Sequence, residues 1–372
     1  MINRLYINNF RGLDNFELVL KGNSSVLLIG KNGSGKSTVG WALQIFQSVA
    51  RGTNRVNELV RESDFTRGRM DAPIRFEIEI ELENQKYVYV LAFERLAGTK
   101  ELRVFEERLS VEGRAIYSRT GAQVVLAAVQ PKEAEPKVVE FLIDWHLVAL
   151  PIVQQSETDP LSIFKRILSR IVILRPVPFL MDGESNTETL TPDDRGKDLG
   201  AWFAGLMALA PAEYSRIDEY LKTVMPDLKD VRNPTVGTDA RQLTVQFARG
   251  SGSLSLPVKD LSDGEKCFLL CALLLASNAA YGPLMCFWDE PDNYIGLLEA
   301  GRFVLTIRRA FEERGQFVAT SHNPEAIRAF SDENTILLSR RSHLEPTQSR
   351  SLDELRVNGD LVDALIRGDV EI

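Results

Sequence analysis

Hydrophobic and polar residues alternate in short stretches through the first third of the chain. Residues 2–29 predict three strands separated by turns, and the apolar run at 26–29 indicates that the third strand is buried. A helix is predicted over 36–50, just before a glycine that would end it. Alternation returns at 74–82, 87–93, 102–109 and 114–118, which predicts an antiparallel strand meander.

The pattern changes twice further along the chain. Helical stretches are predicted over 134–149, 160–170 and 197–225, followed by a hairpin formed by 241–248 and 253–258. Beyond residue 262, helices at 263–280 and 295–314 alternate with strands at 284–288, 316–320 and 335–338. Such alternation is typical of a mostly parallel sheet with its active loops at the carboxyl ends of the strands.

We therefore expect an α/β fold with a mostly parallel core sheet, an antiparallel β subdomain and a helical insertion. The expected division places an N-terminal lobe with the β meander at 1–130 and a mainly helical insertion or lid at 131–240. A C-terminal lobe follows at 241–345 and a tail at 346–372. A chain of 372 residues is long enough for two compact domains or for one domain with a large insertion.

Composition excludes some classes of protein. With 44% hydrophobic and 26% charged residues, the chain is ordinary for a globular protein. No stretch resembles a membrane span or a signal peptide, so we expect a cytoplasmic protein with no membrane partner. The three cysteines form no C-x-x-C pair, which argues against structural zinc and disulfides. A net charge of −8 argues against an overall basic surface but leaves a local nucleic-acid groove open.

Residues 30–37 fit the phosphate-binding pattern G-x-x-x-x-G-K-S/T, between a predicted strand and a predicted helix. Glycines in this pattern let the backbone wrap the β- and γ-phosphates of a nucleotide, and the helix N-terminus adds partial positive charge. Lys36 would reach those phosphates, and the Ser37 hydroxyl would bind Mg²⁺. The alternative, a chance glycine-rich turn, does not explain the flanking strand and helix. The candidate nucleotide-binding residues are Gly30, Asn32, Gly33, Ser34, Gly35, Lys36, Ser37 and Thr38.

Asp289 and Glu290 follow the predicted strand 284–288. Carboxylates at the end of a buried strand are costly unless a cation or another partner satisfies them. We expect Asp289 to hold Mg²⁺ and Glu290 to orient and polarise an attacking water, although Asp-Glu-Pro is also ordinary turn chemistry. His322 follows the next strand and could contact the γ-phosphate, but a lone histidine there is more often a surface turn residue.

Ser262 and Glu265 have the spacing of a capping box at the start of an apolar helix. A capped helix start that contains Gly264 is also an anion site, so the two interpretations are compatible. Taken alone, the pattern favours the cap. Its place shortly before Asp289 favours a phosphate-handling role as well.

Together these residues resemble the ABC-class ATPases of the RecF/SMC/OLD-like group, in particular the bacterial AAA family predicted ATPases of defence systems. The resemblance includes the opening at 9–13, the Walker A segment at 30–37 and the signature at 261–265. It continues through Walker B at 284–290, the D-loop that begins at 291–293, and His322 as the switch histidine.

The resemblance implies a two-lobed ATPase head that uses ATP and Mg²⁺ and dimerises head to tail. ATP would lie between Walker A of one subunit, with Arg11 nearby, and Ser262, Gly264 and Glu265 of the other. Asp292 and Asn293 would belong to the D-loop, and Gln154 or Gln155 would be the Q-loop residue at the metal.

The function we expect is a dimerisation switch, driven by ATP binding and hydrolysis, that acts on DNA or controls an effector such as a nuclease, in antiviral defence. Its hydrolysis would be slow and regulated. Residues 323–372 are expected to be too few for the nuclease domain of OLD-type proteins, so that effector would be another chain. The alternatives are a RecF-like DNA-repair ATPase and, less favoured by the motifs, a membrane-transporter ATPase subunit. Basic residues at 51–69 form either a solvated face or a DNA groove.

Overall fold

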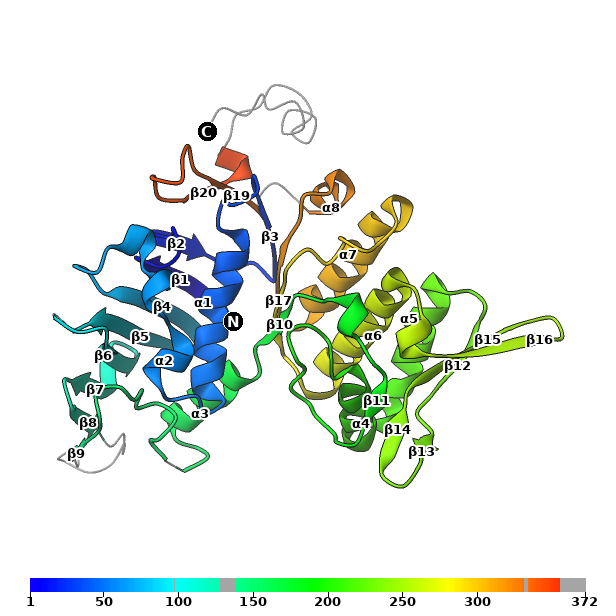
Figure 1. The fold of residues 1–372 in the computed structure, drawn as a ribbon, viewed down its shortest axis with the longest axis horizontal. Coiled ribbons are helices and arrows are strands. Elements are labelled where there is room, and N and C mark those ends of the chain that lie inside the picture. The colour runs from blue at the N-terminus through cyan, green and yellow to red at the C-terminus, as the bar shows by residue number, and fades with distance from the viewer. Residues whose placement is uncertain (97, 128–137, 155, 331–333, 355–372) are drawn as a thin grey trace.

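The computed structural model describes residues 1–96, 98–127, 138–154, 156–330 and 334–354. Two hydrophobic cores lie on opposite sides of a six-stranded sheet (Figure 1). One core joins that sheet to a large antiparallel sheet, and the other joins it to a group of helices. The fold is therefore α/β with mixed sheets.

The larger sheet is eight-stranded and antiparallel, in the order β2-β1-β4-β5-β6-β7-β8-β9. Its inward-facing residues alternate with outward polar ones, as the sequence pattern predicts. The predicted meander is confirmed and extends by two further strands. The strands are β1 (Ile2–Asn8), β2 (Phe16–Val19), β4 (Ile74–Leu82), β5 (Gln85–Arg95), β6 (Leu102–Val111), β7 (Arg114–Thr120), β8 (Gln123–Ala127) and β9 (Val138–Leu142).

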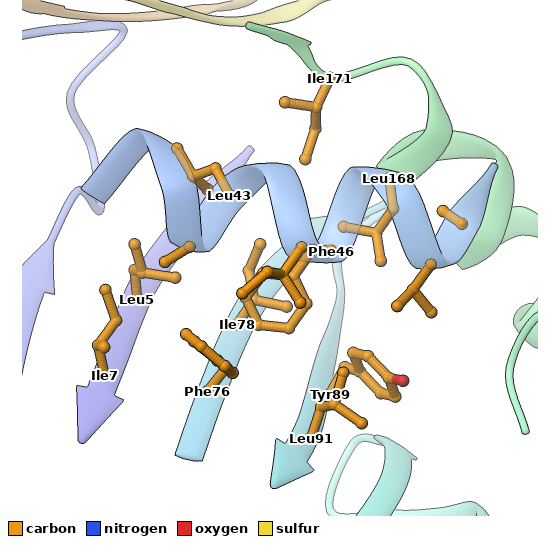
Figure 2. Close-up of a cluster of buried hydrophobic side chains, with 14 of the residues drawn as sticks. Leu5, Ile7, Leu43, Phe46, Phe76, Ile78, Tyr89, Leu91, Leu168 and Ile171 are labelled. Atoms are coloured by element: carbon orange, nitrogen blue, oxygen red, sulfur yellow. The ribbon is translucent and has the colours of Figure 1, made fainter. Parts of the chain in front are cut away.

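Helix α1 (Lys36–Ala50) packs across this sheet and carries the phosphate loop at its N-terminus. Figure 2 shows Leu43 and Phe46 among apolar side chains of β1, β4 and β5. The Phe46 ring lies 6.2 Å from that of Phe76 and 5.8 Å from that of Tyr89, both edge to face. Helix α3 (Pro160–Ser169) covers the far end of α1, and α2 (Val56–Leu59) lies in the same half.

A buried carboxylate fixes the segment that leaves the antiparallel sheet. Glu107 accepts hydrogen bonds from the hydroxyls of Tyr89 (3.0 Å) and Tyr117 (2.7 Å). It also accepts from the backbone N–H groups of Ala149 (2.7 Å) and Leu150 (2.9 Å). Burial, reinforced by the charge of Glu107, raises the pKa of both tyrosines, so they stay protonated donors. This satisfied carboxylate ties residues 149–150 to the sheet.

The six-stranded core sheet has the order β10-β17-β18-β3-β19-β20. All its pairs are parallel except β19 with β20, so the predicted mostly parallel sheet is confirmed. Its strands are β10 (Val172–Leu174), β17 (Met285–Trp288), β18 (Gln316–Thr320), β3 (Ser25–Ile29), β19 (Thr335–Ser339) and β20 (Gln348–Ser351). The carboxyl ends of the parallel strands therefore meet at one edge.

Helices cover the other face of the core sheet (Figure 1). They are α4 (Leu199–Leu209), α5 (Tyr214–Val224), α6 (Asp263–Tyr281), α7 (Leu297–Glu313) and α8 (Pro324–Arg328). Two three-stranded sheets lie beside them, built from β11 (Glu184–Ser185), β12 (Leu228–Arg232), β13 (Thr235–Val236), β14 (Ala240–Gln242), β15 (Thr244–Arg249) and β16 (Gly252–Pro257). Strands β15 and β16 form the predicted hairpin. Among the residues described, no helix is long and apolar enough to cross a lipid bilayer.

The middle of the chain differs from its prediction. The helix expected over 134–149 is wrong in its described part, because β9 pairs with β8 and extends the antiparallel sheet. The helix expected over 197–225 is two helices, separated where Pro211 lacks an N–H to continue α4. The segment 131–240 thus supplies strands to both large sheets as well as helices. Most of the tail, 355–372, lies outside the described residues.

Candidate functional site

The carboxyl edge of the core sheet carries a row of five residues, four of them with polar side chains, one directly after each parallel strand. In spatial order they are Arg175 after β10, Asp289 after β17, Ser321 after β18, Gly30 after β3 and Arg340 after β19. Residues from widely separated parts of the sequence therefore meet beside the phosphate loop. Such an edge is where parallel α/β sheets bind ligands.

The loop at 30–37 follows β3 and turns directly into α1. Gly30 has a φ of 144°, and a Cβ there would collide with the carbonyl oxygen of Leu338 on the neighbouring strand β19. Only glycine allows this close approach. Gly33 and Gly35 also have positive φ angles, and Gly35 precedes the first helical residue, Lys36. The backbone can therefore curl around an anion in front of a helix N-terminus.

Lys36 lies across its own loop. Its ammonium donates hydrogen bonds to the carbonyl oxygens of Gly30 (2.8 Å) and Lys31 (3.2 Å). Burial lowers the pKa of Lys36, and the charges of Glu290 and Asp289 partly offset that effect. The Lys36 ammonium and the two carboxylates thus lie close enough to interact electrostatically. The sequence predicts that they belong to one site.

Asp289 and Glu290 are positioned by one hydroxyl from the adjacent strand. Thr320 Oγ1 donates to Asp289 Oδ1 (2.6 Å) and accepts from the Glu290 N–H (2.9 Å). Glu290 has a φ of 52°, in the left-handed region that a non-glycine residue occupies at a cost of about 1–3 kcal/mol. Backbone strain of this kind concentrates at functional sites.

His322 lies beside Glu290, with 3.6 Å between Nε2 and Oε1. Burial lowers the pKa of His322, assisted by the positive charge of Lys36, while Glu290 and Asp289 oppose the shift. Its neighbour Ser321 donates to Asp292 Oδ2 (2.9 Å), and burial raises the pKa of Asp292. The D-loop is thereby tied to the strand that presents His322.

The side chains suit Mg²⁺ held mainly by a nucleotide. Ser37 on α1 and Asp289 on β17 offer oxygen ligands, and Mg²⁺ prefers one or two protein oxygens with phosphates and water. Within the described ranges, no three histidine, cysteine, aspartate or glutamate side chains gather as a metal site. The donor set therefore fits a nucleotide-bound metal better than an all-protein cage.

The guanidinium groups of Arg11 and Arg175 both lie over the indole ring of Trp41 on α1. The guanidinium carbon of Arg175 lies 4.0 Å from the ring centroid and that of Arg11 lies 4.9 Å from it. Arg11 also pairs with Asp64 at 2.7 Å. Arg175 donates to Gln44 (2.9 Å) and Asp194 (3.0 Å), which links the sheet edge both to α1 and to the loop before α4.

The signature residues form the capping box that their spacing predicts. The Glu265 carboxylate accepts from the Ser262 N–H (2.8 Å) and hydroxyl (2.7 Å), and the Ser262 side chain caps α6. A Cβ on Gly264 would lie 3.1 Å from the carbonyl oxygen of Tyr294. The α6 N-terminus is therefore next to the segment that carries Asp292 and Asn293.

Gln154 is not brought to this site. It lies beside Ala50 at the C-terminal end of α1, whereas Lys36 and Ser37 begin that 15-residue helix, about 20 Å away. Gln154 is therefore wrong as a Q-loop metal ligand, and Gln155 lies outside the described residues. At the strand next to β17, the structure instead presents Arg175, whose backbone neighbour Leu174 accepts from the Asp289 N–H (2.8 Å).

Sequence reasoning missed Arg175, Thr320 and Arg340. Each lies at the end of a short apolar run or directly after it, which is the signal that identified Asp289. The basic segment at 51–69 has a structural role in part, because Arg67 and Arg69 both pair with Asp14.

Three comparisons with known proteins bear on this site. Residues 1–146 match the family described as "AAA ATPase domain", a stretch that includes the phosphate loop but ends before Asp289. No curated protein matches the chain significantly.

Solved structures extend the likeness over the whole fold. An SMC head bound to the C-winged helix domain of ScpA superposes with a TM-score of 0.56 at 14% identity, over 95% of this chain and 99% of that chain. An SMC head with an extended coiled coil, bound to the C-terminal domain of ScpA derived from Pyrococcus furiosus, gives 0.53 at 14% identity, over 95% and 97%. At this identity the likeness concerns the fold. The chain therefore contains a match to an ATPase domain over residues 1–146 and shares the overall fold of SMC heads.

Proposed function

We propose that the chain binds and slowly hydrolyses ATP, and that ATP drives its head-to-tail dimerisation as a switch. The observation that carries this proposal is the row at the sheet edge. A phosphate loop, a carboxylate pair and His322 share one edge, with 3.6 Å between the histidine and Glu290. A simple nucleotide-binding protein needs the loop but not a strained glutamate beside it.

The phosphate loop and the residues beside it each have a chemical task in the proposal. The loop N–H groups and Lys36 hold the β- and γ-phosphates, while Ser37 and Asp289 hold Mg²⁺, which supplies charge neutralisation when bound. Glu290 orients the attacking water and accepts its proton. His322, neutral because its pKa is lowered, hydrogen-bonds the terminal phosphate. Thr320 keeps both carboxylate residues in place.

Support for a protein interface comes from the segment after the D-loop. Leu297 and Leu298 begin α7 with side chains 65% and 98% exposed, close to the signature helix through Tyr294 and Gly264. Adjacent exposed leucines beside a functional site are typical of an interaction surface. In the proposal, Ser262, Gly264 and Glu265 of one copy face the ATP held by the other, and Leu297 and Leu298 are buried with them.

The test is an ATP-dependent change of mass in a variant that cannot hydrolyse ATP. Glu290→Gln should elute as a dimer with Mg·ATP and as a monomer with ADP, measured by size-exclusion chromatography with light scattering. Adding Leu298→Glu should prevent that dimer. The matched control is Leu254→Glu on the β15–β16 hairpin, where Leu254 is 55% exposed, and it should leave the dimer intact. A monomer under all nucleotide conditions would contradict the proposal.

The proposed output is action on DNA or control of an effector such as a nuclease, in antiviral defence. This part rests on the resemblance of the motifs to RecF/SMC/OLD-like ATPases. The pairing of Arg67 and Arg69 with Asp14 gives more support to an effector than to a DNA groove at 51–69. ATP-dependent DNA binding that weakens steeply with salt would favour DNA, and no binding at low salt would favour an effector.

A further inference from the structure

A pocket of about 720 Å³ adjoins the phosphate loop on the side away from Asp289. It lies between residues 29–34, His322 and the segment that connects β19 to β20. Its volume is in the range of small-molecule sites, about 300–1,000 Å³. The pocket therefore has room for part of a ligand whose remainder lies in the loop.

Arg340 lines this pocket, and its guanidinium lies against the phosphate loop. Its Nη2 atom lies 3.1 Å from where a Cβ of Gly33 would be, and Nη1 lies 3.3 Å from that position at Gly12. A side chain at either glycine would crowd the guanidinium. Among the residues that the structure describes, Arg340 has neither a salt bridge nor a side-chain hydrogen bond. Its fork of N–H donors is thus free for a ligand.

The segment that follows Arg340 is hydrogen-bonded to the two turns that contain Gly12 and Gly33. Thr347 Oγ1 donates to the carbonyl oxygen of Ser34 (2.8 Å), and the Thr347 N–H donates to that of Gly12 (3.3 Å). Arg67 also donates to the carbonyl oxygen of Leu344 in this segment. The segment between β19 and β20 is therefore held against the phosphate loop and the turn at Gly12, which preorganises Arg340.

The charges around the pocket select an anion. Lys31, Arg341 and Arg350 line it together with Arg340, and Glu345 is the carboxylate among the lining residues. His322 lines it as well, and that histidine is next to Glu290. The pocket thus opens toward the end of the site where the proposed function places the terminal phosphate.

We propose that Arg340 binds the γ-phosphate of ATP from the β19 side of the loop and sets the preference for ATP over ADP. The inference rests on the proposed function. An arginine suits this task because its planar fork pairs with two phosphate oxygens at once. Lys36 would hold the phosphates from within the loop, and Arg340 would contact the group that distinguishes the two nucleotides.

The test compares nucleotide affinities by isothermal titration calorimetry, with Mg²⁺ and either ADP or a non-hydrolysable ATP analogue that keeps three phosphates. Arg340→Ala should weaken binding of the analogue about 10- to 100-fold, as expected for lost charged hydrogen bonds, and change ADP binding less than about threefold. Arg340→Lys should recover part of the loss. Arg249→Ala removes the same charge from the exposed end of β15, outside the pocket, and should change both affinities less than about threefold.

The outcomes distinguish a failure of the proposed role of Arg340 from a failure of the proposed ATPase function. Wild-type binding of the analogue, or an equal loss of both nucleotides, in a folded Arg340→Ala variant would overturn the role of Arg340 and leave the proposed ATPase standing. A wild-type protein that binds neither nucleotide would overturn both. Thermal unfolding of each variant shows whether it is folded.

Discussion

The two sides of the phosphate loop differ in how their charges are held. On the β17–β18 side, Asp289 is hydrogen-bonded to Thr320, and the Glu290 carboxylate lies beside His322. On the β19 side, Arg340 lies against Gly33 without an acidic partner among the described residues. The first side is built for carboxylate chemistry with a fixed geometry. The second offers positive charge to a ligand.

This difference predicts a division of labour along one sheet edge. Residues of the acidic side should control the rate of hydrolysis, since they face the metal and the water in the proposed site. Arg340 on the basic side should control affinity for the terminal phosphate. Some variants should change kcat but not the affinity for ATP, and others should change the affinity for ATP but not kcat. Such variants test the comparison directly.

The largest effect on rate is expected at Glu290. Glu290→Gln keeps the side-chain shape but cannot accept a proton, so kcat for phosphate release should fall by about 10²- to 10⁴-fold. Affinity for Mg·ATP should remain close to that of the wild type. Arg249→Ala at the exposed end of β15 is the control and should leave kcat nearly unchanged. A Glu290→Gln variant that hydrolyses ATP at the wild-type rate would remove Glu290 from the chemistry.

A pH profile should report on His322. Burial and the charge of Lys36 put the pKa of His322 below its ordinary value of 6.5, so the ring is neutral at pH 7. As pH falls, protonation adds a charge that the nucleotide-free site disfavours, and kcat/KM, which reports the free protein, should decline only below pH 6.5. His322→Gln should lower kcat and remove this acid limb. A midpoint above 6.5 that vanishes in His322→Gln would show the opposite shift.

The lowered pKa of His322 also predicts how the stability of the protein depends on pH. Because the folded pKa of His322 is below the unfolded one, the unfolded state binds more protons between the two values. Stability should therefore fall as pH drops through 6.5, and His322→Gln should reduce that dependence. Urea unfolding at pH 7 and pH 6 measures this change in the free energy of unfolding for the wild type and the variant.

The smallest effect is expected at Thr320. Thr320→Val keeps the shape but leaves the Glu290 N–H without its acceptor and Asp289 without its donor. Unfolding free energy should fall by about 1–3 kcal/mol, and kcat should fall less than in Glu290→Gln. Thr320→Ser retains the hydroxyl and is the matched control. Equal stability of the Val and Ser variants in urea unfolding would show that the hydroxyl does not position this side.

Much of the acidic side and of the fold was predictable because the signals are local. Alternation over 74–118 predicts the meander, and the loop at 30–37 has its pattern in consecutive residues. Asp289 and Glu290 follow an apolar run that ends at Trp288. Residues 138–142 carry no comparable local signal in the sequence. They form an edge strand because they pair with β8.

Arg175 and Arg340, at the two ends of the row along the sheet edge, could not be predicted from such local signals. Arg175 and Arg340 flank the site only because β10 pairs with β17 and β19 pairs with β3. Strand order is a long-range property, and the sequence around β10 does not reveal its neighbours. Residue type alone suggests Gln154 as a metal ligand, but the fold places it at the far end of α1. Residue type without strand order therefore misplaces a site residue.

The central claim is that residues 30–37 hold the phosphates of ATP, and Lys36→Ala tests it most directly. Titration calorimetry with Mg·ATP should show saturable binding by the wild type and a loss of about 100-fold in the variant, because the ammonium contributes charged hydrogen bonds to the phosphates. Circular dichroism shows whether the variant is folded. Equal affinity of the wild type and a folded Lys36→Ala variant would contradict the account.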